Sequence, residues 1–135
     1  MTVLISSKNR GKQAEDFAYR YLKAQGLRLI ARNYACRLGE IDLIMQDKDM
    51  LVFIEVRYRQ QHQFGHGLET VDSYKQTKLI KTAEHYLLFN PILAEIPCRF
   101  DVLGISPGKP SLLQKLSPSQ HYPAQVEWLK NAFSR

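Results

Sequence analysis

The fold is decided by residues 39–59, GEIDLIMQDKDMLVFIEVRYR, which read as two strands joined by a tight turn at 47–49. Successive side chains of a strand point to opposite faces of a sheet. Glu40 and Asp42 therefore share one face of the first strand, and Glu55 and Arg57 share one face of the second. If the strands form a hairpin with these faces together, three carboxylates converge beside a guanidinium.

Carboxylates are uncommon in strands that are otherwise apolar, because a buried charge needs a partner or a metal. Asp42 and Glu55 on adjacent strands suit Mg²⁺ or Mn²⁺, which prefer oxygen ligands and keep several waters. Such an ion binds phosphate oxygens and activates water, while a nearby cation such as Arg57 offsets transition-state charge. The alternative is a structural ion-pair ladder across the strands, in which Asp42 or Glu55 pairs with Arg57 or Arg59. Residue spacing leaves both interpretations open.

Length and composition narrow the class of protein. The chain has 135 residues, which predicts a single domain over 1–135 with one core. Its 19 Lys and Arg against 13 Asp and Glu give a net charge of +6, which suits a polyanionic partner. Two cysteines without a metal-binding spacing predict a reducing, cytoplasmic environment. We expect no membrane association, because the chain shows neither a signal peptide nor a segment long enough to cross a bilayer.

Hydrophobic periodicity predicts the elements around the hairpin. Helices are expected over 8–25 and 73–89, and further strands over 27–34 and 98–106. The order α-β-β-β-α-β, followed by a short C-terminal element, predicts an α/β fold with a mixed β-sheet flanked by helices.

Three local patterns complete the prediction. Ser73 followed by Gln76 fits a capping box at the start of the second helix. In the tail, alternation of Val126 and Trp128 predicts a short strand that ends in one helical turn. Residues 1–7 read as a loose lead-in, and 107–123, rich in Pro and Ser, as an irregular loop.

Glu15, GEIDLI at 39–44, FIEVRYR at 53–59 and KQTKL at 75–79 together resemble the PD-(D/E)xK nuclease arrangement. The resemblance is closest to the Holliday-junction-resolvase branch and, within it, to the YraN-type family of bacterial proteins. It extends through CRFDV at 98–102 and VEWLKNAF at 126–133, and so covers nearly the whole chain. It implies a restriction-endonuclease-like fold and metal-dependent hydrolysis of phosphodiester bonds in branched or otherwise structured DNA.

The resemblance also implies roles for the acidic residues. Asp42 and Glu55 would hold Mg²⁺ or Mn²⁺, Glu40 would be an extra ligand or a supporting group, and Glu15 would be a helix carboxylate near the metal. Arg57 stands where the superfamily usually has lysine. A guanidinium stays charged and cannot carry a proton, but it can clamp a phosphate.

Basic and polar residues complete the implied site. Gln76 and Lys78 match polar helix residues that often face the site, although the capping box is a rival explanation for Gln76. Contacts to the phosphates of nucleic acid, DNA rather than RNA, are expected from Arg37, Arg59, Lys75, Lys78 and Lys81. The resemblance is compatible with a homodimer. Two other classes stay open: a nucleic-acid-binding module without catalysis, and a scaffold that binds a protein partner.

Overall fold

The computed structural model describes residues 7–59, 71–107 and 124–135. It confirms the predicted α/β fold, with a mixed sheet and two α-helices. In chain order the elements are α1 (Ser7–Ala24), β1 (Arg28–Cys36), β2 (Gly39–Asp47), β3 (Met50–Tyr58), α2 (Ser73–Leu88), the 3₁₀ turn η2 (Leu93–Glu95), β4 (Cys98–Pro107) and β5 (Ala124–Phe133). The five strands form one sheet in the order β1-β2-β3-β4-β5. Strands β3 and β4 are parallel, and the other neighbouring pairs are antiparallel.

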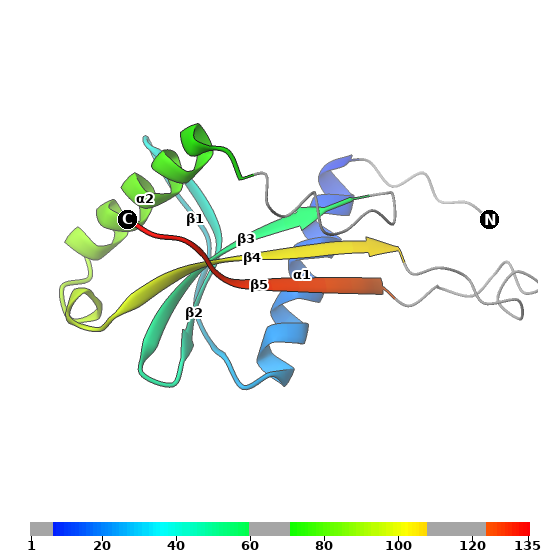
Figure 1. The fold of residues 1–135 in the computed structure, drawn as a ribbon, viewed down its shortest axis with the longest axis horizontal. Coiled ribbons are helices and arrows are strands. Elements are labelled where there is room, and N and C mark those ends of the chain that lie inside the picture. Colours follow the sequence, from blue (N-terminus) through cyan, green and yellow to red (C-terminus); the bar gives the residue numbers. More distant parts are fainter. Residues whose placement is uncertain (1–6, 60–70, 108–123) are drawn as a thin grey trace, which may run out of the picture.

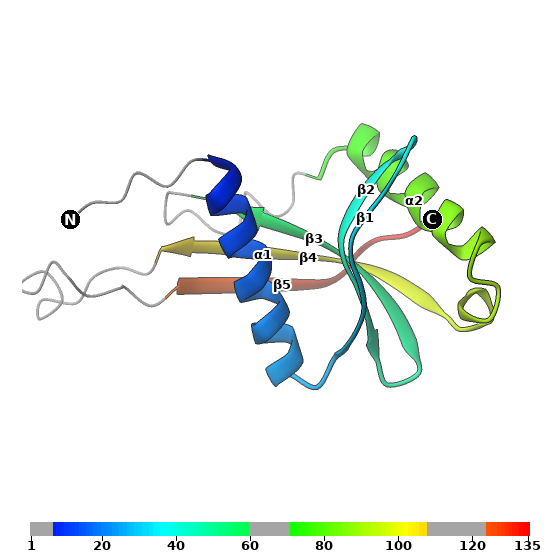
Figure 2. The same cartoon turned by 180° about the vertical axis from the view of Figure 1, so that it is seen from behind.

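The two α-helices cover opposite faces of the sheet. In Figure 1 α1 passes behind the strands, and in Figure 2, seen from the other side, it lies in front of them. Strand β3 is buried from both sides: Phe53 packs in one core cluster with Leu79 of α2, and Ile54 packs in the other with Leu22 of α1. The sequence of the central strand is therefore a nearly continuous apolar run, and a charged residue within it is unusual.

The β2–β3 hairpin forms in the predicted place. Its register runs from Asp47↔Met50 beside the turn to Leu43↔Ile54. Beyond that pair, the backbone N–H of Val56 donates to Asp42 Oδ2 at 2.7 Å. A side-chain carboxylate thus enters the strand pairing where the ladder ends, which fixes the position of Asp42.

The first turn of α2 corrects one prediction. Asp72, with φ −66° and ψ 167°, is the N-cap, and its side chain accepts a hydrogen bond from the backbone N–H of Lys75 at 2.7 Å. The side chain of Gln76 donates to the backbone oxygen of Val71 at 2.6 Å. The predicted capping box of Ser73 and Gln76 is therefore wrong, because Ser73 already has helical geometry and the extended residue before it caps the helix.

The tail corrects a second prediction, because β5 continues as a strand to Phe133 without the expected helical turn. Asn131 adopts a left-handed φ of 53°, and the β4–β5 register shifts between Phe100 and Val102. The Asn131 N–H donates to Asp101 at 2.9 Å. This tertiary hydrogen bond explains why a local helical preference does not decide the structure here.

Asp101 of β4 is a buried carboxylate with a structural role. It is 1% exposed and accepts hydrogen bonds from Arg99 Nε at 3.0 and 3.2 Å and from Trp128 Nε1 at 2.9 Å. Arg99 also donates to Asp47 at 2.9 Å. Burial opposes the charged guanidinium, but the hydrogen bonds to both carboxylates hold the pKa of Arg99 above its usual value. The charge of Asp101 is thus matched by donors on several sides.

Gly39 lets β2 approach α2. It has a φ of 152°, and a Cβ at this position would lie 2.9 Å from Oγ1 of the buried Thr82. We expect Gly39→Ala to lower the free energy of unfolding by about 1–3 kcal/mol, because the helix must shift to admit the methyl group. Gly11→Ala is the control: its Cβ would meet nothing within 4 Å, so stability should be kept or increased. Urea denaturation measures both, and equal unfolding midpoints would contradict the close approach.

The predicted lead-in at 1–7 and irregular loop at 107–123 lie outside the described residues, apart from Ser7 in α1 and Pro107 in β4. Of the helices in the described ranges, none combines the length and the apolar character needed to cross a membrane.

Candidate active site

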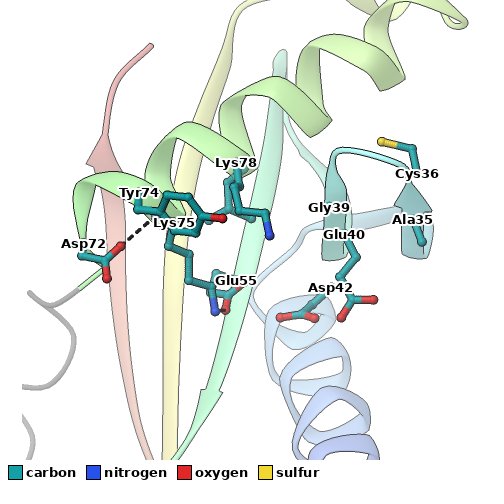
Figure 3. A pocket seen from close by; sticks show the side chains of 11 residues that line it. Ala35, Cys36, Gly39, Glu40, Asp42, Glu55, Asp72, Tyr74, Lys75 and Lys78 are labelled. Atoms are coloured by element: carbon teal, nitrogen blue, oxygen red, sulfur yellow. Dashed lines mark hydrogen bonds and ion pairs between the residues drawn. The ribbon is translucent and has the colours of Figure 1, made fainter.

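A cleft of about 590 Å³ opens between the first half of α2 and the β1–β2 end of the sheet. We call it the α2 cleft. Figure 3 shows that Glu40, Asp42 and Glu55 come from the strands, whereas Lys75 and Lys78 come from α2 and Asp72 directly precedes it. The lining residues are Ala35, Cys36, Gly39, Glu40, Asp42, Glu55, Asp72, Tyr74, Lys75, Lys78 and Leu79.

Glu55 is a buried carboxylate of the cleft, and Asp42 lies half-buried beside it. Glu55 is 8% exposed, and the Asp42 carboxylate points toward it from β2 (Figure 3). Burial first, and then the negative charge of Glu55, raise the pKa of Asp42 to about 8, although the hydrogen bond from Val56 acts in the opposite direction. Asp42 contrasts with Asp101, because its carboxylate faces another carboxylate instead of several donors. The pair is therefore suited to a cation.

Lys75 supplies a cation to this pair in the structure. Its Nζ lies 2.6 Å from Glu55 Oε1, and its side chain is 45% exposed. The ion pair of Glu55 thus reaches from the sheet to α2, instead of running between strands as the ladder interpretation expected. Lys78 lies one turn further along the same side of the helix and also lines the cleft (Figure 3).

Glu15 of α1 lies in a second hollow that adjoins the α2 cleft. The side-chain amide of Asn33, turned so that its nitrogen faces Glu15, donates to both carboxylate oxygens at 2.9 and 3.2 Å. Glu15 also raises the pKa of Asp42, after the larger effects of burial and Glu55. Glu40 lines both hollows. Four predicted acidic residues therefore form one connected region.

The lining of the second hollow carries its own ion pair. Arg32 Nη2 lies 2.6 Å from Asp16 Oδ1. The hydrogen bond from Arg32 lowers the pKa of Asp16, although burial acts in the opposite direction. Lys12, Arg32 and Asn33 surround the carboxylates here, as lysines do in the α2 cleft. Positive charge thus flanks the acidic region on both sides.

Of the predicted catalytic residues, Arg57 and Gln76 line neither the α2 cleft nor the second hollow. Arg57 is half-buried on β3, and its Nε is buried without a hydrogen-bond partner among the described residues. Gln76 is engaged with the Val71 carbonyl before the helix. Alternation placed Arg57 on the face of Glu55, but its position lies two residues, roughly 6–7 Å, further along the strand.

Of the residues predicted to contact phosphates, some line the α2 cleft and others lie outside it. Lys75 and Lys78 line the cleft, whereas Lys81 is exposed further along α2 and does not. Arg37 is exposed in the turn between β1 and β2. Arg59 follows β3, and its backbone N–H donates to Ile105 at 2.8 Å.

Sequence reasoning missed Tyr74 and Asp72, which both line the cleft. A signal for Tyr74 was present, because residues four apart lie on one side of a helix and Lys78 is four residues later. Asp72 could have been found as an N-cap, since aspartate is among the residues preferred there.

The donor set allows a test of the expected metal. Within 7–59, 71–107 and 124–135, no group of three or more His, Cys, Asp or Glu side chains is arranged to hold an ion. Glu40 is therefore not assembled with Asp42 and Glu55 into a three-ligand set. Mg²⁺, however, is commonly bound through one or two carboxylates with several waters and substrate phosphates completing its shell. Asp42 and Glu55 fit that kind of site.

Comparisons with known proteins agree with the predicted family. The model of the "Uncharacterised protein family UPF0102" matches residues 14–105. A UPF0102 protein of Nitrosococcus oceani is 46% identical over 93% of this chain and 92% of its own length. Relatives from Alcanivorax borkumensis (42% identity, 98% of each chain) and Coxiella burnetii (47% identity, 90% of this chain and 89% of the relative) bear the same family name. The chain therefore belongs to the UPF0102 family, the YraN-type family that its motifs resemble.

Proposed function

We propose that the protein is a metal-dependent endonuclease that hydrolyses phosphodiester bonds in DNA, with branched or structured DNA as its substrate. One observation carries the proposal: two facing carboxylates, the buried Glu55 and the half-buried Asp42, share an open cleft with Lys75 and Lys78. The negative charge of Glu55 raises the pKa of Asp42, and a cation between the two carboxylates would relieve this repulsion. Lysines at the mouth of the cleft favour a polyanion.

Each residue would have a distinct part in the reaction. Asp42, held by the Val56 N–H, and Glu55 would hold Mg²⁺ or Mn²⁺. When bound, the ion supplies a Lewis acid for the phosphate and lowers the pKa of a water molecule. Lys75, once released from Glu55, is free to contact the scissile phosphate, and its ammonium can carry a proton as a guanidinium cannot. In this scheme the lysine that the superfamily places on the strand comes from α2 instead.

The proposal includes the compartment. We place the protein in the cytoplasm, since DNA is there and the half-buried cysteines Cys36 and Cys98 are free thiols. Free thiols are typical of a reducing compartment.

A cleavage panel tests the proposed reaction. Duplex, single-stranded and branched DNA, with RNA of the same sequence, are incubated with Mn²⁺ or with a chelator. We expect Mn²⁺-dependent cleavage of branched DNA by the native protein and none by Asp42→Ala. Binding without cleavage on every substrate would favour the non-catalytic nucleic-acid-binding module. Absence of salt-dependent binding would favour the protein scaffold.

Salt dependence tests the basic side of the cleft. Each lost phosphate contact lowers the slope of log K against log salt by about 0.9 for duplex DNA. We expect Lys75→Ala with Lys78→Ala to reduce the slope by about 1.8 and to weaken binding. Lys81→Ala is the matched control, because Lys81 is exposed on the same helix outside the cleft lining. An unchanged slope in the double variant would exclude the cleft from the contact surface, and a reduction by the control would show that the contacts extend beyond the cleft.

A further inference from the structure

Tyr74 is an exposed aromatic residue at the mouth of the α2 cleft. Its residue exposure is 72%, yet it lines the same cleft as Asp42 and Glu55. It lies in the first turn of α2, directly after the N-terminal residue of the helix. Single exposed apolar residues need no explanation by themselves. The ring of Tyr74, however, shares one cleft with the carboxylates Asp42 and Glu55 and with two lysines.

The neighbours of Tyr74 hold positive charge next to the ring. Lys78 Nζ lies 5.5 Å from the ring centroid, within the range of a cation–π contact. Lys75 follows Tyr74 in the chain, and Figure 3 shows all three side chains on the cleft side of α2. A planar group placed on this ring would have two ammonium groups within reach of its anionic substituents. A nucleotide has this combination of a planar base and a phosphate.

We propose that Tyr74 is a stacking platform for an unpaired nucleobase beside the phosphate bound by Lys75 and Lys78. The inference rests on the proposed function and names its substrate class: DNA with an unpaired nucleotide next to the scissile bond. A base inside a duplex already stacks on both faces, whereas a base at a branch, flap or single strand is free to leave the stack. Aromatic stacking tolerates any base, so the site selects structure over sequence.

The test measures binding without cleavage. A short single strand carrying one fluorescent 2-aminopurine, and the same strand in a duplex, are titrated with protein in chelator at low salt. Stacking on the ring should quench the fluorophore. We expect Tyr74→Ala to weaken single-strand binding about 5- to 150-fold, the contribution of one stacked base, and to abolish the quenching. Duplex binding should change little. The Tyr74→Trp variant should keep both the single-strand affinity and the quenching of the fluorophore.

Phe89→Ala is the matched control. Phe89 is 73% exposed at the other end of α2, outside the cleft lining, so its removal should leave single-strand affinity unchanged. Thermal melts check that each variant keeps its fold.

Two results would overturn the stacking site. One is equal weakening of single-strand and duplex binding by Tyr74→Ala, and the other is no weakening at all, as expected if the ring only covers the stem of Lys78. Neither result affects the proposed reaction, because cleavage by native protein in Mn²⁺ is scored separately. Conversely, binding that quenches the fluorophore in chelator, without cleavage in Mn²⁺, would support the stacking site and contradict the proposed nuclease activity.

Discussion

Lys75→Met is expected to lower the rate of Mn²⁺-dependent DNA cleavage by about 10²–10³-fold, the effect of removing one transition-state contact. The reason is geometric: Lys75 Nζ lies 2.6 Å from Glu55, and the lysine side chain is 45% exposed. An ammonium in that position can move from the carboxylate to a phosphate oxygen without a change of the backbone. Single-turnover rates at saturating protein separate this loss from weaker binding. Lys81→Met, on the same helix but outside the cleft lining, should cleave at the native rate.

The Arg57→Ala variant decides between two assignments of the catalytic cation. The position of Arg57 in the EVRYR motif predicted that this residue contacts the scissile phosphate. In the structure, however, Arg57 does not line the α2 cleft. We expect Arg57→Ala to retain more activity than Lys75→Met. Lys75→Arg adds a distinction, since it keeps the charge but cannot release a proton. A large loss of cleavage activity in Arg57→Ala, with a small loss in Lys75→Met, would assign the catalytic cation to Arg57 of β3 instead of Lys75 of α2.

The acidic part of the site could be predicted from sequence because a hairpin determines it locally. A two-residue turn fixes the register, and the period of two along each strand then fixes which side chains share a face. Asp42 and Glu55 are therefore brought together by about fifteen consecutive residues. Arg57 shows the limit of the same reasoning. Alternation states the face of a side chain but not whether the cleft extends as far along the strand.

The basic part of the site could not be predicted in the same way. Lys75 meets Glu55 of β3 only because α2 packs on β1 and β2, and no local pattern encodes that placement. The helix start also depended on backbone geometry, since Asp72 and Ser73 are both good N-cap residues. In the tail, hydrogen bonds from Asn131 and Trp128 to the buried Asp101 override local preference. Such long-range contacts are not visible in a single sequence.

Asp42 should make the metal-free protein lose stability as pH rises. Its ordinary pKa of 3.8 applies to the unfolded chain, whereas burial and Glu55 raise the folded value to about 8. Between these values the unfolded chain is ionised while the native state keeps the proton. The stabilising difference is therefore complete below about pH 4 and is lost as pH rises to about 8. Each pH unit in this window costs up to about 1.4 kcal/mol of unfolding free energy.

Urea denaturation in chelator at several pH values measures this loss. Native protein should lose several kcal/mol between pH 4 and pH 8 relative to Asp42→Asn, whose amide does not titrate. Asp49→Asn is the control, since Asp49 is exposed in the β2–β3 turn and should leave the native pH profile unchanged. Parallel profiles for native protein and Asp42→Asn would show that Asp42 is solvated instead of facing Glu55.

Mn²⁺ should reverse the loss, because a cation favours the ionised carboxylates that high pH produces. At pH 8 and a hundredfold excess over its dissociation constant, the ion should stabilise the native protein by about 2.7 kcal/mol. Asp42→Asn with Glu55→Gln should melt as high or higher in chelator, yet gain nothing from Mn²⁺. A structural role for the carboxylates predicts the opposite: no effect of metal on the native protein, and a weaker double variant with Lys75 left without its partner. Melting curves of the two proteins in the two buffers therefore distinguish a metal site from an ion pair that only supports the fold.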